Sequence, residues 1–174
     1  MEFQKSVSPL MDVLEGHWLL TLATIALDDH LPYATPLYYS VLPIGGVKGM
    51  TTPHLITVSE AQSHHSRYVA CGPTAVAAGI GAEVEQFSEI SGVQLRGEMV
   101  AVDERFGSQQ DTIWENFCIR HPIARSFHRK PSGHQPYLFA IQWAKVTDNQ
   151  WGFGRHLVYE FPRDWSWICS INTT

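Results

Sequence analysis

SEAQSHHSRYVACGPTAVAAG, Ser59 to Gly79, combines the end of a predicted strand, a short helix and the start of the next strand. The helix is predicted over His64–Cys71, with Ser63 as its N-cap. Gly72 and Pro73 follow, a pair that ends helices because glycine reaches the left-handed conformation and proline cannot continue the hydrogen-bond ladder. The polar side chains of this stretch therefore gather at the helix entrance.

This helix entrance is a candidate anion site. The first turn of a helix presents free backbone N–H groups and the positive end of the helix dipole, and here it carries His64, His65 and Arg67. A phosphate group suits such an arrangement. The same residues allow a second interpretation, in which Ser63 only caps the helix and both histidines face water.

Composition indicates one globular domain, residues 1–174, with an N-terminal helix in 1–16 and a C-terminal tail in 163–174. Hydrophobic residues make up 44% of the chain and charged residues 17%, which is enough apolar content for a real core. The net charge of -5 argues against a general nucleic-acid binder. Nine scattered histidines lack the spacing of metal ligands, so no metal site is predicted.

The chain is expected to be cytoplasmic. Its first residues lack the apolar region of a secretory signal, and no apolar run approaches the roughly 18 residues of a membrane span. The three cysteines, Cys71, Cys118 and Cys169, are far apart and form no CxxC pair. We expect reduced thiols, two of them in the core.

The first half of the chain reads as a meander of strands. Ser8 and Pro9 start a short helix that stops at Gly16, and His17–Leu27 is apolar enough to be a strand buried on both sides. The returning strand Leu31–Leu42 contains two prolines, which remove ladder donors and predict an edge, a bulge or a gap where the backbone can face a ligand. A loop over Pro43–Pro53 precedes the third strand, His54–Ser59.

The second half adds strands and one longer helix. Strands are predicted over Ala75–Ile80, Gly92–Val102, Tyr137–Thr147 and Phe153–Phe161. In Gly92–Val102, alternation places Val93, Leu95 and Met99 on a core face and Gln94, Arg96 and Glu98 on a face that can reach a ligand or partner. The helix runs from a capping box of Ser108 and Asp111 to Arg120, and buries Ile113, Trp114, Phe117 and Cys118.

A basic segment, Ile123–His134, follows this helix in an otherwise acidic chain. A solvated loop and an anion-binding loop explain it equally well. Gly79 and Gly81 lack the third glycine of a dinucleotide fingerprint, and no catalytic signature of a hydrolase is present. Mostly antiparallel strands with a few short helices predict a small barrel.

This order of elements resembles the FMN-binding split barrels related to pyridoxamine 5'-phosphate oxidase, over most of the chain. In that superfamily a Ser or Thr at a strand end is followed at set spacings by another, by Lys or Arg, and by a Pro that opens the next strand; Ser59, Ser63, His65 and Pro73 fall at those spacings. The motifs GVQLRGE, RHPIARSF and KVTDNQWGFGRHLVY resemble an uncharacterised branch of small bacterial members. The resemblance implies a six- to seven-stranded antiparallel split β-barrel, mainly β, with short flanking helices.

The resemblance also implies a cofactor and a partner. It implies a homodimeric flavoprotein with FMN between the subunits, acting as an oxidoreductase on a small molecule that the sequence does not identify. Ser59, Ser63, His64, His65 and Arg67 would lie around the phosphate, while Thr35, Pro36 and Leu37 would run beside the flavin ring. Gln94 or Trp114 would approach from the partner subunit.

Two departures keep other functions open. His65 stands where better-known members have Lys or Arg, and imidazole is mostly neutral near pH 7. The strand Gln that some relatives direct at the flavin falls on Gly92, with Gln94 two residues on. One alternative is a sensor or carrier that binds a ligand without turnover. Another is a barrel that binds haem or a deazaflavin, with His64, His65 or His156 as an axial ligand to haem.

Overall fold

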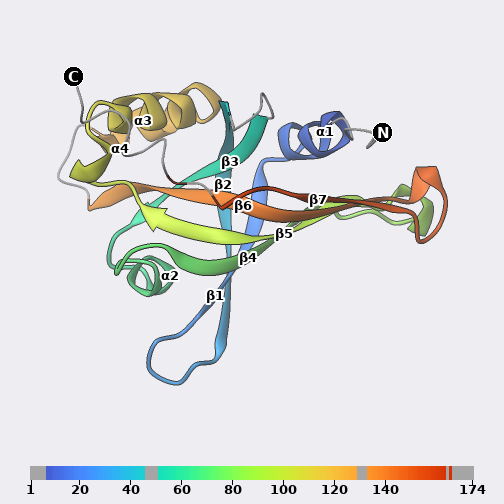
Figure 1. The fold of residues 1–174 in the computed structure, drawn as a ribbon, viewed down its shortest axis with the longest axis horizontal. Helices are drawn as coiled ribbons and strands as arrows, with labels where there is room; N and C mark the ends of the chain where they lie inside the picture. Colours follow the sequence, from blue (N-terminus) through green and yellow to red (C-terminus); the bar gives the residue numbers. More distant parts are fainter. Residues whose placement is uncertain (1–6, 46–50, 129–132, 164, 166–174) are drawn as a thin grey trace.

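The computed structural model describes residues 7–45, 51–128, 133–163 and 165. Seven antiparallel strands follow the order β3-β2-β1-β4-β5-β6-β7, and β3 also pairs with β6. That last pairing closes β1 to β6 into a barrel, and β7 extends the sheet beyond it (Figure 1). The strands are β1 Leu19–Ile25, β2 Pro32–Gly45, β3 Thr51–Glu60, β4 Thr74–Gly81, β5 Ser91–Ala101, β6 His134–Asp148 and β7 His156–Glu160. The predicted mainly-β split barrel is confirmed.

Short helices connect and cover these strands. They are α1 Ser8–Gly16, α2 His64–Tyr68, α3 Gln109–Arg120 and α4 Arg125–His128, with 3-10 turns at Phe87–Glu89, Glu104–Phe106, Pro122–Ala124 and Asn149–Trp151. In the part of the chain that the structure describes, no helix has the length and apolar character needed to cross a membrane.

Two separate cores hold the fold together. The first fills the barrel, and α1 closes one end of it with the fully buried Leu10 and Leu14. The Tyr39 hydroxyl donates to the Leu14 carbonyl oxygen at 2.6 Å, which ties that helix to β2. The second core lies where α3 packs on the outer face of the sheet, and Ile113, Trp114, Phe117 and Cys118 are buried there as predicted.

The outer face of β1 corrects one prediction. Its side chains alternate between exposed and buried, so the strand is not buried on both sides. Within the described part of the chain, α1 closes the barrel end and α3 lies over the β3 side, so neither of these helices covers the apolar residues on the outer face of β1. Exposed apolar side chains therefore accumulate along the β1–β2 hairpin, including its turn and the residue before β1: Trp18, Leu19, Ile25, Leu27, Leu31, Tyr33 and Tyr38.

Strand β2 changes partner along its length, and Pro32 and Pro36 lie in the part that has an open edge, as their missing ladder donors predict. Residues 32–38 pair with β1, whereas residues 39–45 pair with β3. Within the described ladders, the second edge of residues 32–38 has no strand beside it. The strand also extends to Gly45 and β3 begins at Thr51, so the loop predicted over Pro43–Pro53 is too long.

Both predicted serine caps lack their hydrogen bond. Ser63 is the N-cap of α2 and Ser108 that of α3, but neither side chain bonds a backbone N–H of its helix. The Ser63 hydroxyl is used by Ser66 instead. Ser108 has helical rather than extended dihedral angles, the wrong backbone geometry for a cap. Helix α2 also ends at Tyr68, three residues before the predicted Cys71.

Three further segments refine the sequence predictions. Segment Ile123–His134 is not a simple loop, since it contains α4 and the start of β6, although residues 129–132 lie outside the described chain.

Glu98 is buried and does not face a ligand. Its carboxylate accepts hydrogen bonds from Arg163 and from Trp165 Nε1, each at 3.0 Å, at the start of the tail. Cys118 is buried and Cys71 is exposed, while Cys169 falls among residues 166–174, outside the described chain.

Candidate functional site

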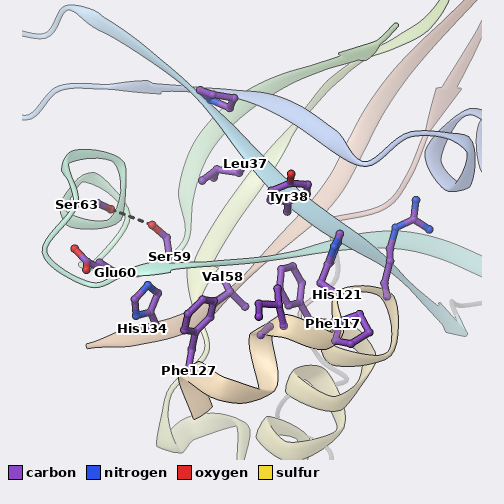
Figure 2. A pocket seen from close by; sticks show the side chains of 15 residues that line it. Leu37, Tyr38, Val58, Ser59, Glu60, Ser63, Phe117, His121, Phe127 and His134 are labelled. Carbon is purple, nitrogen blue, oxygen red and sulfur yellow. Dashed lines mark hydrogen bonds between the residues drawn. The ribbon is translucent and has the colours of Figure 1, made fainter. Parts of the chain in front are cut away.

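A pocket of about 700 Å³ lies between β2 and the segment from α3 to α4. The unpaired edge of β2 forms one wall, the ends of β3 and β6 the floor, and the helical segment the opposite wall (Figure 2). Its size is within the range of about 300–1,000 Å³ typical of small-molecule sites. The lining residues are Pro36, Leu37, Tyr38, Val58, Ser59, Glu60, Ser63, Phe117, Arg120, His121, Pro122, Ile123, Ala124, Phe127 and His134.

One end of the pocket, here called the hydroxyl end, consists of Ser59, Ser63, Ser66 and His65. Ser59 Oγ lies 3.3 Å from Ser63 Oγ, as Figure 2 shows, and 2.8 Å from His65 Nε2. The Ser63 hydroxyl donates to Ser66 Oγ at 2.7 Å and lies 3.2 Å from His65 Nε2. Only Ser59 and Ser63 line the pocket, so the imidazole lies behind the two hydroxyl groups.

His65 is held neutral by its surroundings. The side chain is only 7% exposed, and burial is the main reason that the pKa of the imidazole is below its usual value. The neighbouring His64 lowers the pKa further by repulsion between the two rings when both are charged. The helix that carries both residues has five residues, so its dipole is small and the hydroxyl groups provide the polar contacts of this end.

The opposite end, here called the aromatic end, is formed by Tyr38, Phe117 and His121 (Figure 2). The His121 ring lies 4.6 Å from the ring of Phe117 and 5.2 Å from that of Tyr38. His121 Nε2 lies 2.8 Å from the Tyr39 carbonyl oxygen, which can only accept, so this nitrogen carries a proton. Burial lowers the pKa of His121, against the effect of that hydrogen bond, and leaves Nδ1 as the ring atom free to accept a proton.

A cation and an anion complete the pocket walls. Arg120 lies 4.5 Å above the Trp18 ring and donates to the Glu15 carbonyl oxygen at 2.9 Å, so packing fixes its position beside His121. Glu60 lines the hydroxyl end, where its exposed carboxylate would repel a bound anion. Between the two ends the walls are apolar, with Leu37, Val58 and Phe127 facing one another across the pocket (Figure 2).

The structure brings part of the predicted site together. Pro36, Leu37, Ser59 and Ser63 line the pocket, and Thr35 is the half-buried neighbour of Pro36. His64 and Arg67 are exposed on α2 and are not among the lining residues. The His64 ring instead stacks on Tyr33, with 5.7 Å between ring centroids.

Gln94 and Trp114 lie away from this pocket. Gln94 lines a second hollow of about 610 Å³ on the outer face of β1, β4, β5 and β6. Pro36 lines both this hollow and the first pocket. Trp114 is 6% exposed in the core beneath α3. His156, named as a haem ligand candidate, is exposed on β7, and it lines neither hollow.

Sequence reasoning missed the aromatic end. The sequence predicts Phe117 only as a core residue and Pro122 only as the helix stop, and it predicts no site role for Arg120 or His121. The available signal was the Arg-His-Pro triplet at the end of an amphipathic helix, where a cation and an imidazole leave the helix together. Their meeting with Tyr38 depends on how α3 packs against β2, which local sequence does not specify.

Comparison with known proteins identifies the fold. No family model matches the sequence, and no curated protein is similar to it. The structure is similar to a heme binding protein from Mycobacterium smegmatis, with a TM-score of 0.68 and 16% identity over 91% of this chain. This chain spans only 59% of that protein.

Two further solved structures have the same fold. A FAD-binding protein from Mesorhizobium loti has a TM-score of 0.59 and 16% identity, over 82% of this chain and 94% of its own. A Clostridium acetobutylicum protein related to general stress protein 26, of the pyridoxinephosphate oxidase family, has a TM-score of 0.57 and 9% identity, over 89% and 94%. At these identities the similarity establishes the fold.

Proposed function

We propose that this chain, which has the split-barrel fold of the pyridoxamine 5'-phosphate oxidase-like superfamily, binds FMN in the pocket between β2 and α3–α4. The observation that carries the proposal is the polarity of the pocket: two hydroxyl groups at one end, an unpaired backbone edge along one side and apolar walls between. A ligand with a phosphate and a flat, largely apolar ring has the same distribution of polarity.

Different lining residues would bind the phosphate and the ring of the flavin. Ser59 would donate to a phosphate oxygen beside Ser63, and the backbone of Pro36 and Leu37 would run beside the ring. Leu37, Val58 and Phe127 would exclude water from the ring. When bound, the flavin supplies hydride and electron transfer, so we propose an oxidoreductase whose small-molecule substrate enters at the aromatic end.

His121 is the side chain best placed to exchange a proton with such a substrate. Its Nε2 is committed to the Tyr39 carbonyl oxygen, which fixes the ring, and its lowered pKa leaves Nδ1 a neutral acceptor near pH 7. Glu60 is the one carboxylate among the lining residues, and it lies at the hydroxyl end, away from the substrate.

A homodimer is part of the proposal. The exposed apolar side chains lie along the β1–β2 hairpin, and Tyr38 belongs both to this group and to the pocket. Apolar patches of this kind mark interaction sites. A second copy seated on β1 and β2 would cover the open side of the pocket and enclose the ligand.

Haem is the second candidate ligand, because the haem-binding protein from M. smegmatis shares the fold with the TM-score of 0.68. None of His64, His65 and His156 suits axial ligation, since none lines the pocket. His121 and His134 do line it, at opposite ends, and either imidazole could reach an iron atom in the pocket.

A visible spectrum of the purified protein, taken after incubation with each ligand and gel filtration, tests the proposal. We expect a retained two-banded flavin spectrum after incubation with FMN. A Soret band after incubation with haem that is lost in His121→Ala or His134→Ala would show that the ligand is haem and not FMN. Retained flavin that no nicotinamide or dithionite reduces would leave a flavin-binding carrier or sensor and contradict the oxidoreductase assignment.

A further inference from the structure

The hydroxyl end has a fixed number of protons, and counting them shows what it can offer a ligand. Each serine hydroxyl has one proton to donate. Ser63 gives its proton to Ser66 Oγ, at 2.7 Å. Ser59 lies 2.8 Å from His65 Nε2, so with a lone pair on Nε2 the Ser59 proton is given to the imidazole. Neither pocket-lining hydroxyl then has a proton left for an anion.

Protonation of His65 reverses this arrangement. An imidazolium carries N–H on both ring nitrogens, so Nε2 becomes a donor to Ser59 Oγ at 2.8 Å and to Ser63 Oγ at 3.2 Å. Ser59 no longer needs to donate to the ring, and its proton becomes available to the pocket. The same step places a positive charge directly behind the two serines, where it attracts an anion.

We propose that the hydroxyl end is a proton-coupled oxyanion site, in which Ser59 donates to a tetrahedral dianion that binds together with a proton on His65, while Ser63 keeps its hydrogen bond to Ser66. The inference rests on the proposed function, because the phosphate of FMN is the dianion we place there. His65 acts as a positioning residue: it touches the two serines and not the ligand. A chain with Lys at this position would have the charge at every physiological pH, and this chain has it only on acidification or on ligand binding.

Charges around the ring set the direction of the effect. Burial and His64 lower the pKa of His65, which favours the neutral imidazole in the ligand-free protein. With its lone pair on Nε2, the neutral ring holds the Ser59 proton and the site is closed. A bound dianion favours the charged ring and raises its pKa again. Affinity for the anion therefore rises as pH falls below neutral, and binding takes up a proton.

Other ionisable groups on the neighbouring elements modulate this effect. Glu60 lines the pocket, where its carboxylate repels an anion, and the exposed Arg67 of α2 is not among the lining residues. The described residues of β1 and β4 have no ionisable side chain. The remaining groups on the elements around the ring are Tyr33 on β2, Tyr68 on α2, Cys71 after α2, and His134 and Tyr137 on β6.

Nitrogen NMR of the imidazole rings tests the proposal directly. Sulfate serves as the probe, because it stays a dianion between about pH 5 and pH 8, whereas a phosphate monoester titrates near about pH 6. Without sulfate at about pH 8, we expect an unprotonated Nε2 on His65. Saturating sulfate should raise the midpoint of His65 by about one pH unit, equivalent to about tenfold tighter binding to the protonated ring.

Two variants separate the coupling from simple charge effects. His64→Gln removes the exposed neighbour and should preserve the sulfate-induced shift of His65. His65→Lys has a permanent charge and should bind sulfate with an affinity that hardly changes between about pH 6 and pH 8. A His65 midpoint that does not move on sulfate addition, or an Nε2 already protonated at about pH 8, overturns the proposal.

A parallel FMN titration distinguishes this failure from failure of the proposed function. If FMN binds while the His65 midpoint ignores sulfate, the proton coupling is wrong and the flavin site stands. If sulfate moves the midpoint while no flavin is retained at any pH, the oxyanion site stands and its ligand is not FMN.

Discussion

The two ends of the pocket are built in different ways. The hydroxyl end comes from eight consecutive residues, Ser59 to Ser66, where a strand end turns into a short helix. The aromatic end joins Tyr38 of β2 to Phe117 and His121, roughly eighty residues later in the chain. The first depends on local geometry and hydrogen bonds, and the second on packing of α3 against the barrel, so different changes should damage them.

The largest effect is expected for Phe117→Ala at the aromatic end. Phe117 is 4% exposed and supports the His121 ring at 4.6 Å, so its removal leaves a cavity in the outer core. We expect a loss of about 3–5 kcal/mol in the free energy of unfolding, measured by urea denaturation. Phe87→Ala is the matched control, since Phe87 is 78% exposed and should change stability by less than about 0.5 kcal/mol. Equal losses in both variants would contradict this assignment of the core.

Ser59→Ala should weaken FMN binding while leaving the fold intact. The substitution removes a pocket-lining hydroxyl and leaves His65 Nε2 with Ser63 alone. A hydrogen bond to a charged group contributes about 1.5–3 kcal/mol, so we expect the dissociation constant for FMN to rise about tenfold to a hundredfold, measured by quenching of flavin fluorescence. Ser88→Ala, on the exposed Phe87–Glu89 turn, is the control and should bind FMN like the unmodified protein.

Stability should decrease on acidification partly because of His121. Burial lowers the pKa of this residue in the folded state, so the unfolded chain binds the proton more readily. The stabilisation is complete above the unfolded pKa of about 6.5 and is lost as pH falls through the lowered folded value. Unfolding midpoints measured across this range should depend less on pH in His121→Gln, whose amide can still donate to the Tyr39 carbonyl. An unchanged pH dependence would place the titrating group elsewhere.

Glu60→Gln should have the smallest effect, and in the opposite direction. Glu60 is exposed at the hydroxyl end, so water screens its repulsion of an anion. We expect FMN affinity to increase by a factor of about two to five, with a larger gain at low salt because screening is weaker there. Glu89→Gln removes the same charge far from the pocket and should leave affinity unchanged. Weaker binding in Glu60→Gln would mean that the carboxylate contacts the ligand favourably.

The hydroxyl end could be predicted from sequence because its geometry is local. Serines four residues apart at a strand end must lie close when the chain turns into a helix, and Pro32 and Pro36 pointed to the unpaired edge of β2 beside them. The details still depended on tertiary structure. Burial placed His65 behind the serines. The Ser63 hydroxyl donates to Ser66 Oγ and does not accept from a backbone N–H, as a cap would.

The aromatic end required long-range information. The 3.6-residue pattern predicted α3 and its buried face correctly, but no pattern states which strand that face meets. His121 reaches β2 because α3 lies across it, and this positions Nε2 on the Tyr39 carbonyl. The prediction that β1 is buried on both sides is wrong for a related reason. The sequence shows that the residues of β1 are apolar, but it does not show what covers them.

The difference in affinity between FMN and riboflavin tests the central claim most directly, because riboflavin lacks only the phosphate. Titration of both ligands by flavin fluorescence, with the unmodified protein and Ser59→Ala, reports whether the hydroxyl end holds the phosphate. We predict that FMN binds at least about tenfold more tightly than riboflavin and that Ser59→Ala removes most of this difference. Equal affinity for the two flavins, or a phosphate preference that survives in Ser59→Ala, would contradict the account.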